Sequence, residues 1–432
     1  MRRFLSLPVF AVAVLAASAA AHASRFTTLY TFCPGAPLVP CAAGSQPSYL
    51  LLEPDATPGA PVIFGITQLG GAAGQGVAFE LLPNETGTAY RETVLYNFCS
   101  LGSCTDGALP VGTLLKDSLG DLYGTTAGGG ANGEGTIFEL IPGTGGYSDS
   151  ILYSFCSLAN CADGRAPEWL IAPGNGELYG VTGGDDLPLS TVFAFSASGG
   201  ESVLHSFPFC RSHCLDGVDP TSVVFATGEL YGSTCCGGAH LKRRRVGLPV
   251  GGVVFKLSLD GGESILYNFC SVSHCADGNG PGPLLVGKRG RLYGVTSAGG
   301  AHGKGAVFMI SRTGTEEVLY DFCTLANCAD GAEPSGGLVS DAHGNLYGIT
   351  NSGGAPRKAG GTVFELVRGD TGGQSTYTER VLYSFSLCPF PEGAASCQPV
   401  GLAGDASGNL YGATMFGGGG VKGTVFKIDP QN

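Results

Sequence analysis

The residues of this chain with the clearest chemistry are its sixteen cysteines. Fourteen of them stand in the sequence as seven pairs of closely spaced residues. Closing such short loops by a disulfide would stabilise the fold by about 2 kcal/mol per bridge, through the lost entropy of the unfolded chain. Zinc would need further ligands for every pair, and no regularly spaced histidine or cysteine supplies them. We therefore expect seven local disulfides. The pairs are Cys33/Cys41, Cys99/Cys104, Cys156/Cys161, Cys210/Cys214, Cys270/Cys275, Cys323/Cys328 and Cys388/Cys397.

Cys235 and Cys236 are adjacent in the sequence and lie outside this pairing pattern. One interpretation is a vicinal disulfide, which could form a hard, apolar platform for a ligand. The other is a pair of buried thiols. Both interpretations stay open at the level of the sequence.

A recurring aspartate follows the second cysteine in the motif Cys-x-Asp-Gly. One hypothesis is a ring of carboxylates that could hold Ca²⁺. The alternative is an Asp-Gly turn, in which the side chain bonds nearby backbone N–H groups and glycine takes a positive φ. We favour the turn, because one site rarely needs five equal residues, and we expect no cofactor. The five residues are Asp106, Asp163, Asp216, Asp277 and Asp330.

A few charged residues break the repetition of the chain and are candidates for a loop binding site. The acids are Asp185, Asp186 and Asp219, and the cations form one run of Lys242, Arg243, Arg244 and Arg245. The basic run is most simply a solvated loop; alternatively it anchors an acidic partner such as a uronate-bearing glycan. We find no Ser/His/Asp pattern or zinc-binding histidine pair that would indicate a catalytic site.

The elements that position these residues are repeats. Leu-Tyr-Gly occurs six times, from residues 122–124 to 410–412, with a degenerate seventh copy at 63–65, at intervals of 52 to 64 residues. Each copy precedes a glycine-rich turn and a Val-Phe-like apolar run, and each unit also contains Leu-Tyr-x-Phe and a weaker apolar run. Four short strands per unit with turns between them are typical of a propeller blade.

The phase of the repeat predicts how the ring closes. We order each blade as the weak apolar run (innermost), Leu-Tyr-Gly, Val-Phe and then Leu-Tyr-x-Phe, whose x position is polar in every copy, as a solvent-facing edge requires. The chain then starts with an outer strand at 27–32 and ends with a third strand at 424–428. We therefore predict an all-β, seven-bladed β-propeller with four strands per blade, the last blade being closed by the N-terminal strand.

This order of strands also distributes the loops between the two faces. The Gly-Gly turns, the cysteine loops and the longest insertion, at 239–250, all belong to one face. Departures from the repeat on that face are where we expect a binding site.

Leu-Tyr-Gly-x-Thr, Gly-Gly, Gly-Thr-Val-Phe-x-Leu, Leu-Tyr-x-Phe and Asp-Gly-x-x-Pro together resemble the GloVer tandem-repeat family, over residues 26 to 428. The resemblance implies an exported repeat protein, in a family whose members are mostly of unknown function. The resemblance implies no catalytic residue in this chain, because the residues shared with the family are structural. The cysteine pairs depart from the family pattern.

The N-terminus has the features of a signal peptide at residues 1–23, which would leave 24–432 as a single propeller domain. Arg2 and Arg3 precede an apolar core, and Ala21-His22-Ala23 fits a cleavage site. Export to the periplasm or the exterior agrees with the predicted disulfides. No later segment is apolar enough to span a membrane, and the net charge of −12 argues against nucleic acid as a partner.

Regular repetition without a catalytic constellation predicts an exported, non-catalytic binding or scaffold protein. We expect a monomer whose ligand is a cell-surface glycan or a protein. The alternative is a carbohydrate-active hydrolase or lyase with its site on the loop face. Its carboxylates would then be found among the acids outside the repeat.

Overall fold

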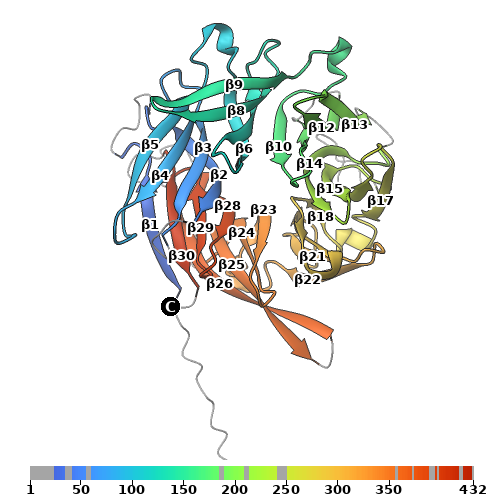
Figure 1. The fold of residues 1–432 in the computed structure, drawn as a ribbon. Helices are drawn as coiled ribbons and strands as arrows, with labels where there is room; N and C mark the ends of the chain where they lie inside the picture. The colour runs from blue at the N-terminus through green and yellow to red at the C-terminus, as the bar shows by residue number, and fades with distance from the viewer. Residues whose placement is uncertain are drawn as a thin grey trace, which may run out of the picture.

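Seven antiparallel sheets, five with four strands and two with five, are arranged around a central axis in the computed structural model of the chain (Figure 1). The structure describes residues 24–34, 41–54, 60–183, 189–208, 214–240, 251–355, 359–371, 374–388, 395–396, 398–417 and 422–430. The predicted signal peptide, residues 1–23, lies outside these ranges.

The four strands of each blade follow the predicted order from the axis outward. The innermost strands are β2 (Ser45–Glu53), β6 (Ala108–Lys116), β10 (Pro167–Ile171), β14 (Val218–Ala226), β18 (Asn279–Pro281) with β19 (Leu285–Val286), β23 (Ala332–Ser340) and β28 (Pro399–Gly404). The second strands, which carry Leu-Tyr-Gly, are β3 (Val62–Leu69), β7 (Leu122–Gly128), β11 (Leu178–Thr182), β15 (Glu229–Cys236), β20 (Leu292–Ala298), β24 (Leu346–Ser352) and β29 (Leu410–Thr414).

The outer half of each blade is a hairpin. The third strands are β4 (Val77–Pro83), β8 (Thr136–Gly143), β12 (Leu189–Ser196), β16 (Val253–Leu257), β21 (Ala306–Ile310), β25 (Ala359–Thr371) and β30 (Thr424–Asp429). The outer strands are β5 (Tyr90–Asn97), β9 (Gly146–Ser154), β13 (Gly200–Pro208), β17 (Glu263–Asn268), β22 (Glu316–Asp321), β26 (Gln374–Cys388) and β1 (Arg25–Thr31). We number the blades 1 to 7 by the innermost strands, from β2 to β28.

The few elements outside this scheme are short. A two-residue strand, β27 (Ala395–Ser396), pairs with β26. Four 3₁₀ helices lie in the crossovers between blades, and a fifth lies in the turn before β20. They are η1 (Gly102–Cys104), η2 (Ala159–Cys161), η3 (Ser273–Cys275), η5 (Ala326–Cys328) and η4 (Lys288–Gly290).

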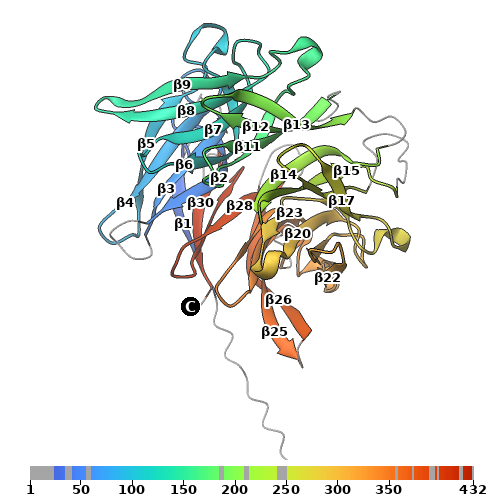
Figure 2. The same ribbon diagram turned by 45° about the vertical axis from the view of Figure 1, so that its right-hand side comes forward.

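The N-terminal strand closes the ring, as the phase of the repeat predicts. β1 pairs antiparallel with β30 from Arg25 opposite Asp429 to Thr31 opposite Thr424, and it forms the outer edge of blade 7 (Figure 2). Blade 7 is therefore built from both ends of the propeller.

The core is a ring of contacts between blades, in which each outer-strand phenylalanine packs on the third-strand phenylalanine of the next blade. Ring centroids in these pairs are 4.9 to 5.4 Å apart. The pairs are Phe32/Phe79, Phe98/Phe138, Phe155/Phe193, Phe207/Phe255, Phe269/Phe308, Phe322/Phe364 and Phe385/Phe426. Nearly all of these rings are fully buried, so the recurrence of Val-Phe and Leu-Tyr-x-Phe follows from packing.

The glycine of Leu-Tyr-Gly makes room for the same phenylalanine. A Cβ on Gly348 would lie 2.5 Å from Cζ of Phe364, and the other six copies place a Cβ within 2.3 to 2.5 Å of the equivalent ring atom. Real Cβ atoms do not approach other atoms so closely, so the ring requires glycine on the neighbouring strand.

The outer edge of every blade carries a β-bulge at the leucine of Leu-Tyr-x-Phe. In blade 1, Ala78 pairs with Tyr96 and Phe79 with Val94, so Leu95 has no partner in the register. Bulges twist an edge and oppose pairing with another chain.

The polar x residue of Leu-Tyr-x-Phe faces solvent and also forms a hydrogen bond to the Gly-Gly turn of its own blade. In blade 1 it is Asn97, whose Oδ1 accepts a hydrogen bond from Ala72 N–H (2.8 Å) in the Gly-Gly turn.

Candidate functional site

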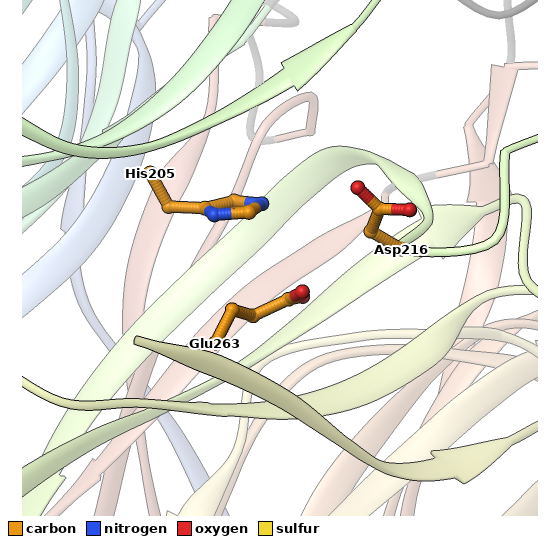
Figure 3. Close-up of side chains that lie close together, drawn as sticks. All are labelled: His205, Asp216 and Glu263. Carbon is orange, nitrogen blue, oxygen red and sulfur yellow. The ribbon is translucent and has the colours of Figure 1, made fainter. Parts of the chain in front are cut away.

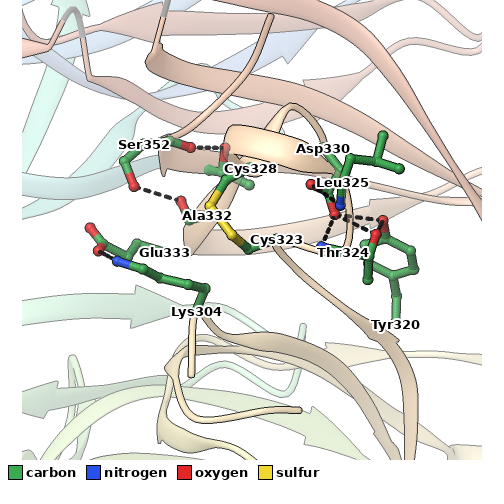
Figure 4. Close-up of a disulfide and its surroundings, with 11 residues drawn as sticks. Lys304, Tyr320, Cys323, Thr324, Leu325, Cys328, Asp330, Ala332, Glu333 and Ser352 are labelled. Atoms are coloured by element: carbon green, nitrogen blue, oxygen red, sulfur yellow. Dashed lines mark hydrogen bonds and ion pairs between the residues drawn. A yellow bond between two sulfur atoms is a disulfide. The ribbon is translucent and has the colours of Figure 1, made fainter. Parts of the chain in front are cut away.

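Disulfides pin several of the crossovers between blades. In the crossover from blade 5 to blade 6, Cys323 is bonded to Cys328 at the end of η5 (Figure 4). Glu333 N–H then donates to the carbonyl of Lys304 on the preceding blade (2.8 Å), and the two side chains form an ion pair of 3.1 Å. This crossover thus fastens two blades together.

Five of the expected disulfides are present in the structure: Cys33–Cys41, Cys99–Cys104, Cys156–Cys161, Cys270–Cys275 and Cys323–Cys328. Cys214 is also disulfide-bonded, whereas its expected partner Cys210 lies outside the described residues. The Cys388/Cys397 pair stays a prediction, because Cys397 lies outside them too. Cys235 and Cys236 are not bridged; their sulfurs are 2.6 Å apart, and Cys235 Sγ is 3.5 Å from Asp219 Oδ2.

The repeated aspartates act inside these turns, as the turn interpretation expects. Asp330 is fully buried and accepts hydrogen bonds from the Tyr320 hydroxyl (2.9 Å), Thr324 N–H (2.8 Å) and Leu325 N–H (3.2 Å). Burial alone would raise the pKa of Asp330, but these hydrogen bonds lower it below its usual value. Asp106, Asp163 and Asp277 accept the same tyrosine bond at 2.8 to 2.9 Å.

The hypothesis of a carboxylate ring exposed for Ca²⁺ is therefore wrong for these four residues. Their side chains are at most 2% exposed and lie beside the outer-strand tyrosines, where local hydrogen bonds already occupy their oxygens. Asp216 differs and is described below.

A second acid at each of these junctions was missed by the sequence analysis. It stands four residues before the tyrosine of Leu-Tyr-x-Phe, and one of its oxygens is buried without a hydrogen-bond partner. Burial raises the pKa of Glu92, Asp149, Glu201 and Glu316 to about 7 and that of Glu379 to about 8. The signal that could have revealed these residues is Glu-x-x-Leu-Tyr, present with Glu or Asp in most copies.

The junction between blades 3 and 4 departs from this pattern, because His205 replaces the tyrosine. Its ring, the carboxylate of Asp216 and that of Glu263 face a common space (Figure 3). One nitrogen or oxygen from each lies within 4.8 Å of the others. Burial lowers the pKa of His205, and burial together with the nearby charge of Asp216 raises that of Glu263 to about 7.

Most of the loop residues that break the repeat lie outside the described residues. These are Asp185 and Asp186 and the basic run Lys242, Arg243, Arg244 and Arg245. Asp219 is described, in β14, with Cys235 as its neighbour. Its Oδ1 also lies close to Gly183, where an added Cβ would be 2.8 Å from it.

A hollow with charged walls lies between blades 5 and 6, on the face of the ring opposite the cysteine loops. This basic pocket, of about 350 Å³, is lined by the cations Lys288, Arg289, Arg291 and Arg368, by Tyr293 and Tyr377, and by Asp341. The turn before β20, the turn before β24 and the extended β25–β26 hairpin form its walls; the hairpin projects from the ring (Figure 2). The sequence analysis favoured the other face, where the repeat departs most.

Local hydrogen bonds hold the walls of the basic pocket. Lys288 Nζ donates to the carbonyl of Ala342 across the blade junction (3.1 Å), and Arg368 Nη2 donates to Ser375 Oγ (2.9 Å). None of the ion pairs found in the described part of the chain involves a cation of this pocket. The pocket therefore carries a net positive charge in an acidic protein.

The single carboxylate in the basic pocket is held by its own turn. Asp341 accepts hydrogen bonds from Asn345 N–H (2.9 Å), Asn345 Nδ2 (2.8 Å) and the Tyr347 hydroxyl (3.1 Å). Burial opposes ionisation, but these bonds lower the pKa of Asp341, so it is charged at neutral pH. Burial also raises the pKa of Tyr377, which therefore presents a neutral phenol to the pocket.

The central channel is partly filled by aromatic rings. Tyr49 of β2 and Trp169 of β10 come from blades that are not adjacent, and their centroids are 5.4 Å apart in an edge-on contact. Trp169 thus packs against another ring inside the propeller, which agrees with a structural role.

Comparison with known families decides what this repeat is. The sequence profile of the Gloeobacter/Verrucomicrobia repeat matches residues 20–246 and 244–432. The chain belongs to this repeat family. The resemblance seen in the sequence is confirmed. No curated protein matches the chain at a significant level.

Solved structures share the fold of this Gloeobacter/Verrucomicrobia repeat protein. The extracellular domain of a putative hybrid two-component system, BT4673 of B. thetaiotaomicron, has a TM-score of 0.51 at 10% identity, over 93% of this chain and 39% of that one. The polysaccharide lyase Uly1 has a TM-score of 0.47 at 11% identity, over 94% and 98%. At such identities the likeness concerns the fold alone. The described part of the chain contains no helix long and apolar enough to cross a membrane.

Proposed function

We propose that this chain is an exported, non-catalytic binding module that holds an acidic saccharide in the basic pocket between blades 5 and 6. The observation that carries the proposal is the composition of that pocket: four cations and two tyrosines around one carboxylate, in a chain of net charge −12. Cations gathered in one hollow repel one another and destabilise the protein, unless a bound anion neutralises their charge.

The pocket offers both kinds of contact that a charged sugar needs. Arginine guanidinium groups form paired hydrogen bonds with a carboxylate, and tyrosine rings present flat apolar faces with a polar edge. Its volume of about 350 Å³ suits one or two sugar rings. A uronic acid, which joins a carboxylate to a sugar ring, is the ligand class that uses all of these groups.

Export is supported by the disulfides, which persist in oxidising compartments. The predicted signal peptide at residues 1–23 agrees with it. A soluble propeller with rigid crossovers and a charged pocket would then act on the outside of the cell, where acidic polymers are found.

The test is a panel of oligosaccharides, in which uronate-bearing, sulfated and neutral chains of equal length are compared for binding to the purified protein. We expect binding of uronate chains, none of neutral chains, and a loss of affinity with rising salt, because the attraction is between exposed charges. Equal binding of neutral sugars would contradict the proposal, and binding of sulfated chains alone would place the selectivity on sulfate.

The alternative function, a carbohydrate-active hydrolase or lyase, is tested on the same panel. Its expected loop acids Asp185 and Asp186 lie outside the described residues, so the structure adds no support for it. A new reducing end or an unsaturated product would establish catalysis. Binding without any product supports the binding module.

A further inference from the structure

We propose that His205, Asp216 and Glu263 bind one divalent transition-metal ion at the junction of blades 3 and 4. The three side chains come from β13, from the crossover after it and from β17, so the fold, rather than a local sequence motif, brings them together (Figure 3). One donor atom of each lies within 4.8 Å of the others.

The donors themselves indicate the class of ion. One imidazole and two carboxylates are ligands of Zn²⁺ and related transition metals, whereas Ca²⁺ and Mg²⁺ prefer oxygen alone. Ligands of a tetrahedral Zn²⁺ at about 2.0 Å are about 3.3 Å from one another, which small side-chain rotations reach from the observed spacing. Water would complete the coordination.

Two of these residues each have a potential donor atom without a hydrogen-bond partner in the described structure. His205 Nε2 and Glu263 Oε1 are both buried, and neither has a hydrogen-bond partner. A buried polar atom without a partner destabilises the fold, so each of these atoms would gain from a bond to a metal ion. The ring of His205 is also held in place by an edge-on contact with Phe207, with centroids 4.7 Å apart.

The other junctions serve as internal comparisons. At the junction of blades 5 and 6, the equivalent residues are Tyr320, Asp330 and Glu379, and the Tyr320 hydroxyl donates to Asp330 (2.9 Å). The Tyr320 phenol has a raised pKa and stays neutral, so it is a poor ligand for a divalent ion. It also already donates a hydrogen bond to the aspartate. Histidine at the same position removes that hydroxyl and supplies a nitrogen donor. The exchange from tyrosine to histidine is therefore what makes the site.

The test is a titration of metal-free, disulfide-intact protein with Zn²⁺, followed by calorimetry. We expect one equivalent to bind. His205→Tyr restores the residue of the other junctions, so it should fold normally and lose binding by more than the roughly 10–100-fold that the loss of an outer-shell partner costs. Glu263→Gln provides a second variant with the same expected loss. Unchanged Zn²⁺ binding in both variants, or no binding by the unaltered protein, would overturn the proposal.

Co²⁺ provides a spectroscopic control against binding at Cys235 and Cys236, which could hold an ion wherever the two thiols are reduced. Co²⁺ held by histidine and carboxylates gives only weak visible bands, as we expect here. An intense thiolate charge-transfer band that survives His205→Tyr would place the ion on the cysteines and overturn the assignment.

Discussion

Gly348 shows at the scale of a single residue why the repeat keeps its glycines. A methyl group there would lie 2.5 Å from Phe364 Cζ and 2.9 Å from Leu338 Cδ2. We predict that Gly348→Ala lowers the free energy of unfolding by about 1–3 kcal/mol, the usual cost of overpacking a core. Gly145→Ala is the matched control, because a Cβ there meets nothing within 4 Å. Urea unfolding of both variants measures the difference; equal stabilities would show that the ring can move aside.

The adjacent cysteines provide a second prediction at this scale. Their sulfurs, 2.6 Å apart, are closer than two non-bonded sulfur atoms normally lie, so we predict that oxidation joins Cys235 to Cys236 in the exported protein. The peptide that contains them should then be lighter by about two hydrogens and gain them on reduction. Alkylation of both thiols in unreduced protein from its native compartment would contradict the bridge.

The blade junctions carry the pH dependence of the fold, at the scale of the element. The pKa values of Glu92, Asp149, Glu201, Glu316 and Glu379 are raised to about 7 or 8 by burial, so folding favours their protonated forms. When folding raises the pKa of a carboxyl group, the group favours the native state at any pH below its pKa in the unfolded chain. This contribution to stability is lost as the pH rises through its pKa in the folded protein.

We therefore predict that the free energy of unfolding falls between about pH 5 and pH 8. Glu379→Gln, which mimics the protonated form, should flatten part of this fall. Urea midpoints at intervals across that range measure it. A stability that stays constant or rises over the range, in a chain with intact disulfides, would contradict the assigned burial of these acids. The aspartates of lowered pKa, such as Asp330, act in the opposite sense, but only in more acidic solution.

The strands could be predicted from the sequence because each apolar run recurs at every blade, and the phase of the repeat placed 27–32 beside 424–428. The buried acids at the blade junctions could also have been predicted, since Glu316 stands four residues before Tyr320 as Glu379 does before Tyr383. The β-bulge and the basic pocket could not be predicted from the sequence. The pocket depends on Arg291, Arg368 and Tyr377, which lie in turns and a hairpin that follow no repeat and meet only through the packing of two blades.

Closure of the ring is a property of the whole molecule. β1 supplies the outer edge of blade 7, and its Phe26 stacks on Tyr383 of the neighbouring blade with centroids 3.9 Å apart. We predict that deletion of residues 1–32 exposes the edge of β30 and causes a lower melting temperature and self-association. Deletion of residues 1–23 alone is the control and should change neither property. Light scattering and thermal unfolding decide the matter; an unchanged, monodisperse protein after the longer deletion would contradict this role of β1.

The charge of the molecule is distributed unevenly, and this unevenness is the basis of the proposed function. The net charge is −12, yet one pocket gathers four cations, three from the turn at 288–291 and Arg368 from the β25–β26 hairpin. In the described part of the chain, an acidic surface would repel polyanions, whereas the basic pocket would attract them.

The most direct test is a calorimetric titration of a uronate trisaccharide into three proteins: the unaltered chain, Arg291→Gln and Lys304→Gln. Arg291 lines the basic pocket, whereas Lys304 lies in an exposed ion pair of the blade 5–6 crossover, on the other face, and changes the net charge equally. We predict that Arg291→Gln weakens binding about tenfold, the cost of a lost charged hydrogen bond, and that Lys304→Gln leaves it within about twofold. Equal affinities of all three proteins, or no binding by the unaltered chain, would contradict the account.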